Sequence, residues 1–312
     1  MKKLGPIIAC LFLFLASACS SNQTHEETKS QTTSEGKLKI GNKKTKLKPN
    51  ANLNLTFLID LSDRIDPEKY PNKTMEYYER DTGYIASVVN AMINHLAYKK
   101  TIAFNDRIRT FIDPPPQDPE VNKVLKNLNF HFTKDNTELE VLNVMEQSYP
   151  QEACKLYQGA IKDNNYIGAD IWSFFKNKAK RDCIKDGSKN ILVILTDGYL
   201  YHSDNKRIEN NRFNYIGKKS FKDKYRLDNG NWKARVKENG YGFIPATQNL
   251  SELEVLVCGL NPYEGNPYEE DVLSYFWESW LQDMGVNRYK ILGSDLPISL
   301  DESIQEFILT EK

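Results

Sequence analysis

The sequence predicts an α/β fold: a doubly wound, mostly parallel sheet with one antiparallel edge strand and helices on both faces. Residues 191–195 are five consecutive apolar residues, three of them β-branched, which is typical of a strand covered on both faces. A second apolar stretch runs from Leu53 to Ile59. Stretches of this kind alternate with amphipathic helical patterns, as they do in a parallel sheet with helical crossovers.

The first strand is expected at about 53–60, followed by a polar loop over 63–80 and a helix that begins near Asp81. Apolar residues recur in this helix at i, i+3, i+4, i+7, i+8 and i+11, a spacing that places them on one face. They are Ile85, Val88, Val89, Met92, Ile93 and Leu96.

Two short strands, 101–104 and 108–112, are expected to form a hairpin around a tight turn at 105–107, which adds the antiparallel edge strand. Helices are predicted at about 118–128, 136–147 and 169–180, with a loop over 154–165. After the central strand and the segment 199–249, strands at 253–258 and 288–292 alternate with helices at 269–284 and 300–309. We expect Trp277 and Trp280 to pack in the core.

The segment 199–249 interrupts this alternation. It contains nine aromatic residues, and over 203–240 it carries eleven Lys and Arg against five Asp and Glu. Since aromatic side chains are more often buried, we expect a subdomain whose aromatic residues pack on one another. The alternative is a surface of aromatic and basic side chains that binds an acidic protein or a glycan.

Residues 1–18 have the pattern of a leader: basic Lys2 and Lys3, then a short apolar core from Ile7 to Leu15. The stretch 15–19 places small residues before Cys19 and resembles the lipobox of bacterial lipoproteins. The resemblance implies cleavage before Cys19, acylation of that residue, and a membrane-anchored protein of the bacterial cell envelope. Ser20 favours the outer membrane. The alternative is an ordinary secretory leader with an incidental cysteine.

Residues 19–49 are polar and lack hydrophobic periodicity, so we expect a disordered tether followed by a folded domain over 50–312. Lys plus Arg and Asp plus Glu both number 42, and this balance gives no indication of a nucleic-acid partner. A mean hydropathy of −0.60 excludes a protein with several membrane spans.

The candidate site lies where two apolar strands end. Asp60 and Ser62 follow the first strand, and Asp197 follows the strand at 191–195. In open parallel sheets, ligands bind outside the carboxyl ends of the strands. We therefore expect the two aspartates and the serine to form one site.

The segments Asp60-Leu-Ser62, Phe104–Arg107 and Leu195-Thr-Asp-Gly198 together resemble the von Willebrand factor A (integrin I-like) domain, over roughly residues 50–310 apart from 199–249. In that family the first strand ends in Asp-x-Ser-x-Ser, a middle loop supplies a threonine, and Thr-Asp-Gly supplies a last aspartate. Together they hold a divalent cation, which a carboxylate of the partner completes.

The resemblance implies a Mg²⁺ site, or one for Mn²⁺ or Ca²⁺, at Asp60, Ser62 and Asp197, because these cations prefer oxygen ligands. Two positions depart from the family pattern. Arg64 stands where the second serine belongs, and Ala169 replaces the middle-loop threonine. Asp170 and Asn165 are the candidate replacements for that threonine.

Two interpretations of Arg64 remain open. Its side chain points outward and a weaker metal site persists, helped by Asp170, or its guanidinium takes the place of the cation and pairs with Asp60 or Asp197 in a metal-free fold. A plainer role for the two aspartates is to accept hydrogen bonds from turn and helix N–H groups.

We expect a lipid-anchored envelope module that binds a protein or glycan carrying an acidic group. The alternatives are a metal-dependent hydrolase that uses the same aspartates and a metal-free structural lipoprotein. No catalytic residue is predicted, since no His, Cys or Lys lies in a nucleophile or base motif. Cys154 and Cys183 flank one predicted helix and are a possible disulfide, whereas Cys258 lies in an apolar strand.

Overall fold

The computed structural model describes residues 45–166 and 168–311. The predicted leader, the acylation of Cys19 and the tether up to residue 44 lie outside the described residues. Within the described ranges, no helix is both long and apolar enough to cross a membrane.

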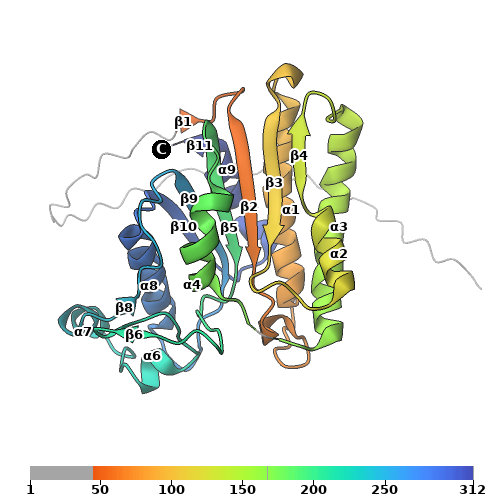
Figure 1. Ribbon diagram of the computed structural model, residues 1–312. Helices are drawn as coiled ribbons and strands as arrows, with labels where there is room; N and C mark the ends of the chain where they lie inside the picture. The colour runs from red at the N-terminus through yellow and green to blue at the C-terminus, as the bar shows by residue number, and fades with distance from the viewer. Residues whose placement is uncertain (1–44, 167, 312) are drawn as a thin grey trace, which may run out of the picture. The chain divides into compact units, whose positions relative to one another are not determined.

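A mixed six-stranded sheet lies at the centre of the described chain (Figure 1). Its strand order is β10-β9-β5-β2-β3-β4, and every neighbouring pair is parallel except β3 and β4. The strands are β2 (Asn52–Ile59), β3 (Asn105–Phe111), β4 (Phe130–Thr133), β5 (Ser188–Leu195), β9 (Leu253–Leu260) and β10 (Arg288–Gly293). The α/β class and a single antiparallel edge strand in this sheet are confirmed.

Helices cover both faces of this sheet, and the alternating side chains of β5 mark the two sides. Ile191, Val193 and Leu195 pack with one group of helices, whereas Leu192 and Ile194 pack with the other. The first group is α1 (Tyr77–Ala97), α2 (Pro119–Asn127), α3 (Leu139–Asp163) and α9 (Pro297–Leu309). The second group consists of one continuous helical stretch and α8 (Glu269–Asp283). The stretch is made of α4 (Ile171–Phe174), η3 (Phe175–Ala179) and α5 (Lys180–Cys183).

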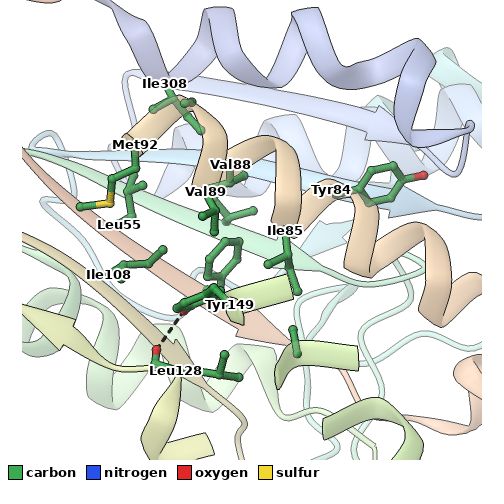
Figure 2. Packing of buried hydrophobic residues seen from close by; sticks show 14 of the residues in the cluster. Leu55, Tyr84, Ile85, Val88, Val89, Met92, Ile108, Leu128, Tyr149 and Ile308 are labelled. Carbon is green, nitrogen blue, oxygen red and sulfur yellow. Dashed lines mark hydrogen bonds between the residues drawn. The ribbon is translucent and has the colours of Figure 1, made fainter. Parts of the chain in front are cut away.

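The core beside α1 follows the predicted helical spacing. All six apolar residues expected on its inner face are buried. Figure 2 shows Ile85, Val88, Val89 and Met92 pointing from α1 toward the sheet. The Tyr149 hydroxyl of α3 donates to the carbonyl of Leu128 at 2.9 Å, which satisfies a polar group inside this core (Figure 2).

The predicted hairpin over 101–112 is wrong. Residues 101–103 form the short turn η2 (Thr101–Ala103), and β3 is one strand parallel to β2. The antiparallel edge strand is β4 instead. Asp106 was expected in a turn, but its side chain is buried in the sheet. Its carboxylate lies 2.7 Å from the Lys99 ammonium, which is also fully buried, and accepts a hydrogen bond from the Leu53 N–H.

The predicted loop over 154–165 is also wrong, because α3 continues to Asp163 with Leu156 and Tyr157 buried in the core. The helix passes through Pro150, a residue that usually ends or kinks a helix. The second half of α3 has polar residues on its outer face, so the helical spacing of its few apolar residues was not recognised in the sequence.

The segment 199–249 forms a small subdomain against α8. It contains β6 (Ile208–Glu209), β7 (Arg212–Phe213), α6 (Ser220–Asp223), α7 (Trp232–Asn239) and β8 (Gly242–Phe243). Its buried aromatic rings pack with one another and with Phe276 of α8, at centroid distances of 4.8 to 5.7 Å for Phe213, Phe221 and Phe243. The expected internal packing is confirmed, and so is the burial of Trp277 and Trp280.

The remaining elements are one short strand pair and one short 3₁₀ helix. Strands β1 (Thr45–Lys46) and β11 (Thr310–Glu311) pair antiparallel, and η1 (Asp63–Ile65) follows β2. The proposed disulfide is not formed, since Cys154 and Cys183 are both free thiols. Cys183 packs in the core on the α8 side of the sheet, whereas Cys154 lies on α3 on the opposite side. Cys258 is buried, as expected.

Candidate functional site

The site lies at the point where the connections of the sheet diverge. From β2 the chain continues to β3 on one side, whereas from β5 it continues to β9 on the other. Ligands of open α/β sheets bind at this switch point, outside the carboxyl ends of the strands. Asp60 directly follows β2, and Asp197 comes two residues after β5, so both aspartates lie at the switch point.

Asp60, Ser62 and Asp197 line one open hollow of ≈ 230 Å³. Its other lining residues come from η1, from the loop after η1 and from the segment 199–249: they are Asp63, Tyr70, Tyr199, Tyr201, Gly217 and Lys218. The structure therefore brings together the three residues predicted from the strand tips. Asp170 is not among the lining residues.

Both carboxylate oxygens of Asp60 accept hydrogen bonds from the chain. Oδ1 accepts the Ser62 N–H at 2.8 Å, and Oδ2 accepts the Thr196 hydroxyl at 3.0 Å. The Asp60 N–H in turn donates to the Leu195 carbonyl at 3.0 Å, which ties the end of β2 to the end of β5. Asp60 thus fixes the loop that carries Ser62.

Arg64 points inward beneath the hollow and not into solvent. Its Nη2 donates to Asp81 Oδ2 at 2.6 Å and to the Leu195 carbonyl at 2.9 Å, and its Nε lies 3.6 Å from Asp60 Oδ2. Burial alone would lower the pKa of Arg64, but the charges of Asp81 and Asp60 outweigh it and hold the pKa above its ordinary value. Arg64 is therefore a fixed positive charge below the site.

Asp81 was missed by the sequence reasoning, although it is the strongest partner of Arg64. It lies near the start of α1 and also accepts the Tyr157 hydroxyl at 2.9 Å. This buried network joins α1 and α3 to the loop after β2. An aspartate inside an otherwise apolar helix face was the only sequence signal that could have indicated it.

A second positive charge reaches the hollow from the segment 199–249. The Lys218 ammonium lies 3.3 Å from Asp197 Oδ2 and 4.4 Å from the centre of the Tyr70 ring. Burial raises the pKa of Asp197 above its ordinary value, and the neighbouring Lys218 charge opposes this shift. The other oxygen of Asp197 accepts the Tyr199 N–H at 3.2 Å.

Asp170 has a structural role outside the hollow. Its Oδ1 accepts the Ser173 N–H at 2.9 Å, so it caps α4, and both oxygens accept from the Asn205 side chain at 3.1 Å. Asn165 lines a separate small cavity beside Pro114 and Gly168. Neither residue takes the place of the middle-loop threonine in the hollow.

The turn after Asp197 requires glycine. Gly198 has φ +95°, and a Cβ there would lie 2.8 Å from Cδ2 of Leu273 and 3.0 Å from Cγ of Leu260. The Trp277 indole N–H donates to the Gly198 carbonyl at 2.8 Å. Core residues of α8 and β9 therefore hold the loop in position.

As arranged, the hollow fits a divalent ion poorly. The Lys218 ammonium lies 3.3 Å from Asp197 and the Arg64 guanidinium 3.6 Å from Asp60, so two positive charges already lie beside these carboxylates. Among residues 45–166 and 168–311, no group of three or more His, Cys, Asp or Glu side chains is placed to hold a metal ion. Arg64 and Lys218 offset part of the negative charge of Asp60, Asp81 and Asp197.

No protein-family model matches the sequence, and no curated protein matches it either. Among solved structures, it is similar to the pilus adhesin SpaC from Lactobacillus rhamnosus GG, with 10% identity, a TM-score of 0.38, and coverage of 85% of this chain and 31% of that chain. An open conformation of SpaC gives 11% identity, a TM-score of 0.37, and coverage of 83% and 30%.

Proximal thread matrix protein 1 from the mussel byssus is similar at 10% identity and a TM-score of 0.34, with coverage of 84% of this chain and 49% of that chain. This chain thus spans less than half the length of these solved chains. Similarity at this level says nothing about function.

Proposed function

We propose that the chain is a binding module of the bacterial cell envelope, anchored to a membrane through a lipid on Cys19, that recognises another macromolecule at the Asp60–Asp197 hollow. The observation that carries the proposal is the convergence of Asp60, Ser62 and Asp197 with Tyr201 and Lys218 around one open hollow at the switch point. We also propose that the fold is a doubly wound von Willebrand factor A-like domain, a proposal that the strand order and these strand-tip residues support.

The charges around the hollow favour a metal-independent form of this site. Lys218 is the solvent-reachable cation beside Asp197, with its side chain 31% exposed, whereas Arg64 is buried. A positively charged group of a partner can replace the Lys218 ammonium between Asp197 and Tyr70, because an ammonium already fits there. In the von Willebrand factor A family, the metal ion attracts an acidic group of the partner. Here the carboxylates of Asp63 and Asp197 would repel such a group.

A hydrolase is the less favoured function. The Ser62 backbone N–H donates to Asp60, and within residues 45–166 and 168–311 no hydrogen bond joins the Ser62 hydroxyl to a base. A serine nucleophile needs a base within hydrogen-bond reach. Divalent-dependent turnover of a phosphoester by the purified protein would favour the hydrolase over the binding module.

The proposal is tested by photo-crosslinking in the native envelope. A photoreactive phenylalanine analogue is placed at Tyr201, which is 48% exposed at the rim of the hollow, and at Val144, which is 60% exposed on α3, as a control. We expect a discrete crosslinked species from position 201 and none of the same mass from position 144. The species should disappear when Asp197→Asn is added to the same chain.

Two outcomes contradict the proposal. One is the absence of any discrete adduct at position 201. The other is an adduct that persists in the Asp197→Asn chain, since the hollow would then not be the recognition site.

A further inference from the structure

A second, larger hollow lies between α7 and α8, apart from the Asp60–Asp197 site. It is an open groove of ≈ 500 Å³. Its walls include residues of β7, of α7, of the turn before β8 and of α8: they are Arg212, Lys237, Tyr241, Tyr275, Ser279 and Asp283. We call this set the α7–α8 groove.

The groove has aromatic rings that are held in place yet reach its surface. Tyr275 is 37% exposed, and its ring packs edge-on against Trp232, with the centroids 5.5 Å apart. Tyr241 is half-buried and packs in the same way against Tyr225 at 5.0 Å. Because these rings already pack against other aromatic side chains, they lose little conformational entropy when a ligand binds.

Planar polar groups lie beside these rings. The guanidinium of Arg212 bonds to the carboxylate of Asp283. It also lies over the backbone of Gly242, where a Cβ would be 3.1 to 3.2 Å from its nitrogen atoms. Glycine at position 242 thus leaves room for Arg212 at the groove wall. A guanidinium and a carboxylate held together present several donors and acceptors in fixed directions.

The charge at the groove is positive on balance, since Arg212 and Lys237 face the single carboxylate of Asp283. An anionic ligand is therefore favoured over a cationic one.

We propose that the α7–α8 groove binds an anionic saccharide. The apolar C–H face of a sugar ring packs on an exposed tyrosine ring, and its vicinal hydroxyls exchange hydrogen bonds with paired planar groups such as Arg212 and Asp283. Lys237 pairs with a carboxylate on the sugar. The open, polar shape of the groove suits a hydrated polymer that extends beyond it. This inference does not depend on the Asp60–Asp197 hollow.

The test is affinity electrophoresis of the full chain in mild detergent, through native gels that contain polygalacturonate, neutral dextran or polyglutamate. We expect polygalacturonate to retard the protein, and the other two polymers to do so much less. Tyr275→Ala should weaken the retardation about tenfold, as loss of a central aromatic contact does. Ser279→Trp, which fills the groove without removing a core side chain, should have the same effect.

Tyr201→Ala and Asp197→Asn are the matched controls, because both lie at the other hollow and should leave the retardation unchanged. Three results overturn the proposal: no retardation by polygalacturonate, equal retardation by polyglutamate, which would indicate charge alone, or full retardation of both groove variants. Failure of crosslinking at position 201 leaves this result unaffected, so the two proposals fail separately.

Discussion

The ammonium of Lys218 lies 3.3 Å from Oδ2 of Asp197, at the mouth of the hollow where the two central strands end. Lys218 belongs to the segment 199–249, which is not part of the resemblance to the von Willebrand factor A domain. The segment therefore contributes more than a packed subdomain: it delivers a cation to the site. Together with Arg64 below, which also pairs with Asp81, this cation offsets part of the negative charge of the two strand-tip aspartates.

Arg64→Met should destabilise the protein by about 3–5 kcal/mol, because it leaves Asp81 and Asp60 buried without their positive partner. The free energy of unfolding is measured by urea denaturation. Arg181→Met is the control, since that side chain is 70% exposed and pairs only with its neighbour Asp182, so little change is expected. An Arg64→Met protein as stable as the wild type would show that the buried network contributes nothing.

Asp197→Asn should stabilise the protein at neutral pH. Burial raises the folded-state pKa of Asp197, so the ionised carboxylate disfavours folding above that pKa, and this penalty is absent below the ordinary aspartate pKa of about 4. The gain in the free energy of unfolding should therefore disappear as the pH falls toward 4. Urea denaturation of both proteins at pH 7 and near pH 4 measures this gain, and an Asp197→Asn protein less stable than the wild type at pH 7 would contradict the prediction.

Gly198→Ala should lower the free energy of unfolding by about 2–4 kcal/mol, because a left-handed backbone cost adds to overpacking against Leu273 and Leu260. Gly187→Ala separates the two effects. Its φ is +70°, yet no atom lies within 4 Å of the new Cβ, so only the backbone cost of about 1 kcal/mol remains. Equal losses in thermal or urea denaturation would refute the proposed clash.

Cys19→Ala should abolish lipid attachment and release the protein from membranes, because the thiol and the amine of Cys19 are the predicted acylation sites. Metabolic labelling with an alkyne fatty acid measures the attachment directly. Cys10→Ala, a cysteine within the predicted leader, is the control and should leave labelling intact. Labelling that persists in the Cys19→Ala protein would refute the lipobox interpretation.

The sequence predicted the elements whose patterns are local. The apolar runs of β2 and β5 and the spacing on α1 depend only on neighbouring residues, and all three elements were found near the expected positions. The predicted strand at 108–112 overlaps β3, but its true start was missed because Asp106 resembles a turn residue until Lys99, which follows α1, is placed beside it. Burial of a paired charge is a property of the tertiary structure.

For the candidate site, the sequence predicted the residues at the strand ends but not their tertiary partners. Asp60, Ser62 and Asp197 could be placed together from the strand ends alone. The partners that decide the chemistry, Asp81 and Lys218, contact the site only through the packing of α1 and of the segment 199–249. The role expected for Asp170 failed because its carboxylate caps α4 instead.

The most direct test of the central claim, that the chain's own cations take the place of a divalent ion at the hollow, is calorimetric titration of the protein with Mg²⁺, Mn²⁺ and Ca²⁺, with Asp197→Asn as the control. The account predicts no saturable binding to the wild-type protein at neutral pH. Saturable binding that disappears in Asp197→Asn would contradict it and would restore the divalent-metal site.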